Sequence, residues 1–318
     1  MTAFTDHIVA HLTDTALIKV EGADSRTFLH NQFTNDLRLV NDQTSQLSSY
    51  CSPKGRMLAL FRIYKQDDAY YMVMPKAIVE PTIKRLRMFV LMSKVTFTDI
   101  SDETIHLGFS GPQSAERLQA LVGDLATAID GVSQHDGITI IQIPGPQPRF
   151  DLFGPTERLT TLQQKLMADA REMDNNQWRL LDIHAGLPTI QAETIDTFVP
   201  QMVNLQAINA LNFKKGCYPG QEIVARMHYL GKVKRRMFLA HVDSSTPPLP
   251  GAALFGPNNE QGLEHKSGTV VSAQLNPEGG CDLLAVLEIE ATENSTIHLQ
   301  SATGPTITLL DLPYTVTA

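Results

Sequence analysis

The sequence predicts a protein of the α+β class that ends in a separate all-β domain. Its 318 residues exceed one typical domain. A strand, a glycine turn and an amphipathic helix follow one another three times in the first half of the chain. Six short β-type runs then crowd the last eighty or so residues. We therefore expect an α+β region over residues 1–234 and a compact barrel or sandwich over residues 235–318.

Each repeated unit joins an alternating strand that ends in glycine to a helix with apolar residues at helical spacing. The three strands are predicted over Ala16–Gly22, Ile105–Gly111 and Phe150–Gly154. The helices behind them carry Leu29, Phe33 and Leu37; Ala115, Leu118, Leu121 and Val122; and Leu159, Leu162 and Leu166. None of these turns reads GxGxxG or GxxxxGK[ST], so neither a dinucleotide site nor a P-loop is predicted.

The remaining elements are predicted from shorter runs. Further strands are expected over Gln46–Cys51, Met57–Tyr64, Ala69–Met74 and Ile138–Ile143, and helices over Ile78–Val90 and Asn175–Gly186. The six C-terminal strands are expected over Met237–Val242, Ala252–Phe255, Gly268–Ala273, Leu283–Ile289, Thr296–Leu299 and Thr306–Leu310.

Composition describes a soluble globular protein with ample core, since 42% of residues are hydrophobic and 19% are charged. The net charge of -8 argues against a surface coated with nucleic acid. The segment Lys214–Arg236 is the exception, with seven basic residues and one acidic residue, Glu222. It indicates either an anionic ligand held at one place or a solvated basic helix face.

The cysteine pattern predicts no disulfide framework and no zinc site. Cys51, Cys217 and Cys281 are far apart and no CxxC occurs, which fits a reducing compartment. The N-terminus lacks the basic and apolar regions of a signal peptide. The longest apolar stretch, Met88–Met92, is too short to span a membrane. We expect a cytoplasmic protein that does not bind membranes.

The stretch Lys214–Glu222, KKGCYPGQE, concentrates the residues that could carry chemistry. Pro-Gly predicts a tight turn, and the apolar run that follows predicts a helix. Cys217 would then lie just before a helix N-terminus and beside two lysines, and these positive charges favour a thiolate. The alternative is a buried, inert cysteine in a glycine turn.

Four other residues are candidates for ligand contacts. Trp178 is either a flat platform for a heterocycle or an ordinary core anchor. Gln221 and Glu222 could hydrogen-bond a pterin-like ring, although Glu222 could equally be a favourable charge in the first helical turn. Arg226 could pair with a carboxylate. No partner spacing supports a metal site at His184.

The run KGCYPGQE closely resembles the K-G-C-Y-x-G-Q-E signature of the YgfZ family of folate-binding proteins. This family is related in fold to the aminomethyltransferase (T-protein) of the glycine cleavage system. The resemblance extends over VEGADSRTFLHNQFTND near the N-terminus and over LDIHAGLPTI before the cysteine motif. It implies two α+β lobes and a C-terminal six-stranded β-barrel around a central channel where folate sits. The positions that match the signature are Lys215, Gly216, Cys217, Tyr218, Gly220, Gln221 and Glu222.

Two departures from related proteins limit what the resemblance implies. Trp178 resembles the family's folate-contacting tryptophan, but Thr15 stands where a second such tryptophan is expected. T-proteins carry an acidic pair after a glycine turn, whereas this chain continues from Gly55 as RMLALF with no carboxylate. Aminomethyl transfer is therefore disfavoured.

The resemblance implies a tetrahydrofolate-binding protein that supports iron–sulfur enzymes, including tRNA-modifying ones. Cys217 and Lys215 would be the reactive pair. Trp178, Tyr218, Gln221, Glu222 and Arg226 would contact the folate, which would carry an unspecified one-carbon group. Direct nucleic-acid binding is not expected. The alternatives are an active aminomethyltransferase and a non-catalytic scaffold.

Overall fold

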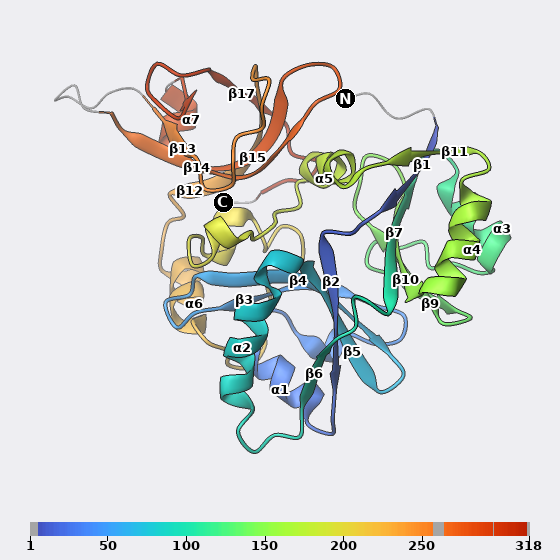
Figure 1. Ribbon diagram of the computed structural model, residues 1–318. Helices are drawn as coiled ribbons and strands as arrows, with labels where there is room; N and C mark the ends of the chain where they lie inside the picture. Colours follow the sequence, from blue (N-terminus) through green and yellow to red (C-terminus); the bar gives the residue numbers. More distant parts are fainter. Residues whose placement is uncertain (1–5, 257–263, 295, 317–318) are drawn as a thin grey trace. The chain divides into compact units, whose positions relative to one another are not determined.

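The computed structural model describes residues 6–256, 264–294 and 296–316 (Figure 1). The chain forms two compact units, each assembled from separate segments. The first unit comprises residues 1–49, 59–178 and 214–218, and the second comprises residues 50–58, 179–213 and 219–318. No helix within the described ranges combines the length and apolar character needed to cross a bilayer.

A six-stranded sheet forms one part of the first unit, in the order β11-β1-β7-β10-β9-β8. Its strands are β11 (Ala170–Met173), β1 (His7–His11), β7 (Thr104–Ser110), β10 (Arg149–Pro155), β9 (Ile138–Ile143) and β8 (Val132–His135). Only the β1–β11 pairing is parallel among the pairings within this sheet. Helices α3 (Ser114–Val122) and α4 (Thr156–Leu166) pack on this sheet, because Leu118, Leu159 and Leu162 share a core with strand residues such as Leu107.

A second sheet has five strands in the order β3-β4-β5-β2-β6. The strands are β3 (Gln46–Cys51), β4 (Met57–Gln66), β5 (Ala69–Pro75), β2 (Thr15–Glu21) and β6 (Thr96–Asp99), with helices α1 (Ser25–Gln32) and α2 (Val79–Val90) and 3-10 turns over Leu37–Leu39 and Lys76–Ile78. The short strands β1, β6, β8 and β11 were not expected, because each has too few alternating apolar residues to give a strand signal.

The predicted helix through Leu29, Phe33 and Leu37 is shorter than its spacing indicates. Helix α1 ends at Gln32, and Phe33 is already extended at φ -108° and ψ 158°. Local polar groups compete with the helix here: the Asp36 side chain accepts from the Arg38 N–H, and the Thr34 N–H donates to the Ser49 carbonyl. Leu37 is still buried, but it lies in a 3-10 turn and not in the helix.

The second unit contains a six-stranded C-terminal sheet, which confirms the six strands predicted there. The order is β16-β13-β14-β15-β12-β17. The strands are β16 (His298–Leu299), β13 (Ala253–Phe255), β14 (Lys266–Leu275), β15 (Cys281–Glu288), β12 (Arg235–Val242) and β17 (Ile307–Leu310). Ile289, expected at the end of a strand, begins helix α7 (Ile289–Asn294).

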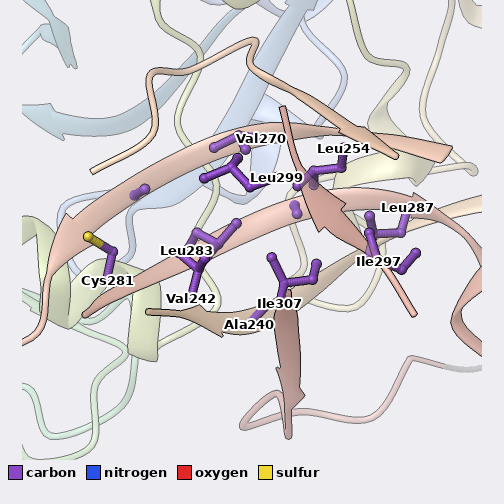
Figure 2. Packing of buried hydrophobic residues seen from close by; sticks show 12 residues of the cluster. Ala240, Val242, Leu254, Val270, Cys281, Leu283, Leu287, Ile297, Leu299 and Ile307 are labelled. Carbon is purple, nitrogen blue, oxygen red and sulfur yellow. The ribbon is translucent and has the colours of Figure 1, made fainter. Parts of the chain in front are cut away.

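This sheet curls around its own core. Figure 2 shows side chains from different strands, among them Leu254, Leu283 and Leu287, converging on one interior. The two edge strands also meet, since the Ile307 N–H donates to the Ile297 carbonyl at 2.9 Å. Curling brings the edges together and buries the alternating apolar face of every strand.

Helices α5 (Asn175–His184) and α6 (Gln221–Tyr229) complete the chain, with 3-10 turns over Ala192–Thr194 and Pro200–Val203. The predicted helix that begins at Asn175 ends two residues early, and Gly186 follows in the left-handed region at φ +66°. The Tyr314 hydroxyl donates to the Gly186 carbonyl at 2.8 Å, and an added Cβ would meet the Tyr314 ring at 2.6 Å. Only glycine tolerates both the left-handed φ of residue 186 and the close approach of the Tyr314 ring.

A buried carboxylate ties helix α5 to the β-domain of the second unit. Asp282 is 2% exposed, and its two oxygens lie 2.6 Å from His184 Nε2 and 2.7 Å from His241 Nδ1. Asn276 Nδ2 donates to the same carboxylate at 2.9 Å. Burial raises the pKa of Asp282, but the hydrogen bonds from His184 and His241 outweigh it and the pKa is lowered. His184 therefore has a structural role.

Replacing Asp282 with asparagine should destabilise the protein by about 3 kcal/mol near neutral pH, because two imidazoles lose their buried carboxylate partner. The stabilisation by an Asp of lowered pKa is present above its unfolded pKa of about 3.9 and is lost as the pH falls through the folded pKa. The difference between wild type and Asp282→Asn should thus shrink below about pH 4. Urea unfolding across pH measures it.

The exposed Asp243 offers a matched control for the loss of one carboxylate. Asp243→Asn should leave the unfolding free energy within about 0.5 kcal/mol of wild type. Equal effects of the two substitutions would show that the carboxylate at 282 holds nothing together.

Candidate functional site

The segment Lys214–Tyr218 combines exposed and buried residues. Lys214, Gly216 and Cys217 are exposed, whereas Lys215 is 5% exposed and Tyr218 is 7% exposed. Lys215 and Tyr218 thus anchor the segment in the first unit, and the thiol between them is presented to solvent.

The Lys215 ammonium binds the C-terminal end of helix α1. Its Nζ donates hydrogen bonds to the backbone carbonyls of His30, in the last turn of the helix, and of Phe33, the C-cap residue. It also lies 5.0 Å from the centroid of the Tyr218 ring. The free carbonyls at a helix C-terminus carry partial negative charge and an aromatic face attracts a cation, so both partners stabilise the buried charge.

The pKa values of Lys215 and its charged neighbours depend on one another. Burial lowers the pKa of Lys215 to about 8, while the negative charges of Asp36 and Cys217 oppose that effect. The hydrogen bond from Arg38 lowers the pKa of Asp36 to about 2, so this carboxylate stays ionised. Burial and the Lys215 charge together lower the pKa of His30. Cys217 therefore lies within electrostatic reach of an ammonium that titrates in the mildly alkaline range.

The three cysteines have different environments. Cys217 is exposed, whereas Cys51 and Cys281 are buried. The Cys281 thiol donates to the Ser244 carbonyl at 3.2 Å, and burial raises its pKa. The interpretation of Cys217 as a buried cysteine is therefore wrong, and it is the accessible thiol of the three.

Helix α6 begins at Gln221, as the sequence predicts, and Gly220 makes this start possible. Gly220 has φ +80°, and an added Cβ would overlap the Ser52 carbonyl and lie 2.6 Å from the Cα of Gly55. Only glycine allows the helix start to lie this close to the turn at residues 52–55. The Gln201 side chain donates to the Val224 carbonyl at 2.6 Å and holds the helix from its buried side.

The predicted ligand residues on α6 lie at its solvent side. Gln221 is half-buried, and Glu222 and Arg226 are exposed. Glu222 and Arg226 are four residues apart, so they share one helix face. Glu222 also lies in the first turn, where a negative charge is favourable. The amide, carboxylate and guanidinium are thus together on one helix, and both interpretations of Glu222 remain compatible with its position.

Trp178 occupies a packed interior instead of an open surface. It is 1% exposed, and the Arg149 guanidinium lies 4.5 Å above its ring. Gly108 lies against its edge, since a Cβ there would be 2.5 Å from Trp178 Cζ2. The structure therefore supports the core-anchor interpretation, and the indole offers no exposed face for folate to stack on.

Thr15, which replaces the expected second tryptophan, lines a cavity of about 80 Å³ in the first unit. Its Oγ1 lies 2.8 Å from His106 Nδ1, and His106 Nε2 lies 3.1 Å from Asp151. Burial raises the pKa of Asp151, but His106, Arg62 and Arg149 outweigh it and lower that pKa. Sequence reasoning did not identify this chain of polar groups, because its members come from β2, β7 and β10.

His30 and Asp36 were not predicted as parts of the site either. Their contribution depends on Lys215, which is 185 residues from His30 in sequence. The only local signal was the Asp36-Leu37-Arg38 turn, in which Arg38 Nη2 lies 2.6 Å from the Asp36 carboxylate. Nothing in that turn indicates a distant lysine.

The contact between Gly108 and Trp178 predicts a coupled pair of substitutions. Gly108→Ala should destabilise by about 1–3 kcal/mol, because the new methyl group overlaps the indole. Trp178→Phe removes the overlapping atoms, so Gly108→Ala should cost at least about 1 kcal/mol less in that background. A double-mutant cycle of chemical unfolding measures the coupling. Additive effects would mean that the two side chains do not meet.

Comparisons with known proteins agree with this architecture. The family model of the GCVT N-terminal domain matches residues 6–144. A protein of Sodalis glossinidius named tRNA-modifying protein YgfZ is 30% identical over 96% of this chain and 92% of its own length. The protein of the same name from Yersinia pseudotuberculosis is 31% identical over 96% of this chain and 92% of its own length.

A solved structure has the same fold. The glycine cleavage system aminomethyltransferase T from Bartonella henselae matches with a TM-score of 0.73 over 97% of this chain and 86% of its own, at 16% identity. This likeness shows the T-protein-like α+β fold that the resemblance implied. Because the sequence match to the YgfZ proteins extends over nearly the full length of both chains, this chain belongs to the YgfZ family.

Proposed function

We propose that this protein binds tetrahydrofolate and supports iron–sulfur enzymes, and through them tRNA modification, with Cys217 as its reactive group. The observation that carries the proposal is the accessible Cys217 held between the buried anchors Lys215 and Tyr218. The names of the relatives, tRNA-modifying protein YgfZ, support the link to tRNA. The protein would act in the cytoplasm.

The side chains of α6 fit a folate by their chemistry. The Gln221 amide has both donors and acceptors, and the Glu222 carboxylate accepts, as the edge of a pterin requires. Arg226 would pair with a carboxylate of the folate tail. Tetrahydrofolate supplies a carrier for a one-carbon group when bound. Trp178 is buried and is not among the proposed contacts, and Tyr218 acts by holding Lys215 and the thiol segment.

Lys215 would be the partner of Cys217 in the reactive pair, as a positive charge two residues away in the chain. Lys215 is itself fixed by the carbonyls of His30 and Phe33, so its charge stays in place. Exposure of the sulfur then gives a substrate or client protein access to it.

An active aminomethyltransferase is the second candidate, because the solved structure with this fold bears that name. The residues after Gly55 disfavour it. Arg56 donates to the Thr197 carbonyl at 2.6 Å, and the following strand β4 carries no carboxylate in its first five residues. A transfer that needs a negative charge beside the folate lacks it at that position. Assay of methylene-tetrahydrofolate formation from an aminomethyl-lipoyl carrier should detect none.

Calorimetric titration of tetrahydrofolate tests the ligand. We expect saturable binding that Arg226→Ala weakens by about 10- to 100-fold, because a charged hydrogen bond to the carboxylate is lost. Arg158→Ala removes an exposed arginine elsewhere and should leave the affinity unchanged. Absence of heat with the wild type would remove folate from the proposal.

Complementation of a strain that lacks its own family member tests the thiol. Cys217→Ala should fail to restore the activity of an iron–sulfur tRNA-modifying enzyme while still binding tetrahydrofolate, because only the sulfur is lost. Cys281→Ala, which removes a buried thiol, should restore activity. Full rescue by Cys217→Ala would disprove the reactive role and leave the scaffold alternative.

A further inference from the structure

The C-terminal half of helix α6 carries a fixed cluster of aromatic rings on the second unit. Phe213 and His228 stack with ring centroids 3.7 Å apart and planes 9° apart. Tyr229 meets His228 edge-on, at 4.7 Å and 70°. The Tyr229 side chain is nevertheless 64% exposed, and the neighbouring Leu230 is 85% exposed. A large aromatic ring is thus held in one orientation and left open to solvent.

Four basic residues follow this ring in the chain, and two of them are paired. Of the basic residues after α6, Arg235 pairs with Glu288 at 2.7 Å and Arg236 donates to the Val316 carbonyl. Lys232 and Lys234 are exposed, and neither forms an ion pair with any residue in the described ranges. No acidic residue occurs from Ile223 to Arg236. Within a protein of net charge -8, the segment that carries Tyr229 is therefore positively charged.

The combination of flat rings and free ammonium groups distinguishes between possible anionic partners. An acidic protein segment would use the lysines but has no need of a fixed, open aromatic ring. A nucleic-acid base stacks on such a ring whatever its identity, while lysines bind the adjacent phosphates. Unpaired bases are required, because bases in a duplex already stack on each other.

We propose that the surface formed by Phe213, His228, Tyr229, Lys232 and Lys234 binds single-stranded RNA, such as a loop of a tRNA. Tyr229 stacks on an unpaired base, and the Phe213–His228 pair holds the tyrosine in place. Lys232 and Lys234 contact the flanking phosphates. This departs from the expectation, drawn from net charge, of no direct nucleic-acid contact. It does not depend on tetrahydrofolate or on Cys217.

Fluorescence anisotropy with the full chain tests the aromatic contact. The probes are a labelled unmodified tRNA, a single-stranded oligoribonucleotide of about 12 nucleotides and a duplex of the same length. Tyr229→Ala should weaken binding to the single strand roughly 5- to 150-fold, the loss expected for one stacked base. Tyr229→Phe keeps the ring and should retain wild-type affinity. The duplex should bind more weakly than the single strand.

Salt dependence tests the phosphate contacts. The slope of log K against log salt concentration should fall by about 1.4 in Lys232→Ala/Lys234→Ala, since each single-strand phosphate contact contributes about 0.7. Lys84→Ala/Lys94→Ala removes two exposed lysines of the first unit and should leave the slope unchanged. Thermal melting of every variant verifies that it is folded.

Four results would each overturn the proposal. One is no binding of tRNA or oligonucleotide at low salt. Another is unchanged affinity in folded Tyr229→Ala. The third is a duplex bound as tightly as the single strand. The fourth is an equal loss of slope in the two lysine pairs, which would mean that only net charge matters.

Discussion

The buried ammonium of Lys215 is the interaction on which the arrangement around Cys217 depends. A charge that is 5% exposed needs partners, and here they are the end carbonyls of α1 and the face of Tyr218. These contacts connect residues almost two hundred positions apart. Because Lys215 must reach α1, the backbone of the cysteine segment has to pass the end of that helix. The thiol two residues later is exposed, between the buried side chains of Lys215 and Tyr218.

Steric constraints act on the other side of the motif. Gly220 permits α6 to begin beside the turn at residues 52–55, where any side chain would overlap the backbone. The two halves of the motif KGCYPGQE thus have different structural roles. Its first half is anchored in the first unit through Lys215 and Tyr218, and its second half begins a helix of the second unit. Cys217 lies between these two halves and is an exposed thiol.

The basic segment Lys214–Arg236 shows how a structure sorts charges that look alike in a sequence. Lys215 stabilises a helix end and Arg235 pairs with Glu288, so these charges are used internally. Arg226, Lys232 and Lys234 are exposed and available to ligands. A net charge summed over the segment cannot separate these groups, because pairing and burial decide which charges a ligand meets.

The fold class, the six C-terminal strands, the start of α6 and the family could all be predicted from the sequence, because hydrophobic period, turn residues and an eight-residue signature are local properties. It could not show that α1 stops at Gln32, where polar side chains compete with the helix. It also left Trp178 between two roles. The folded structure was needed to show that Arg149 and Gly108 enclose the indole, that His184 binds Asp282 and that Lys215 binds α1. Each of these contacts joins residues distant in the chain, and burial and pairing arise only when the chain has folded.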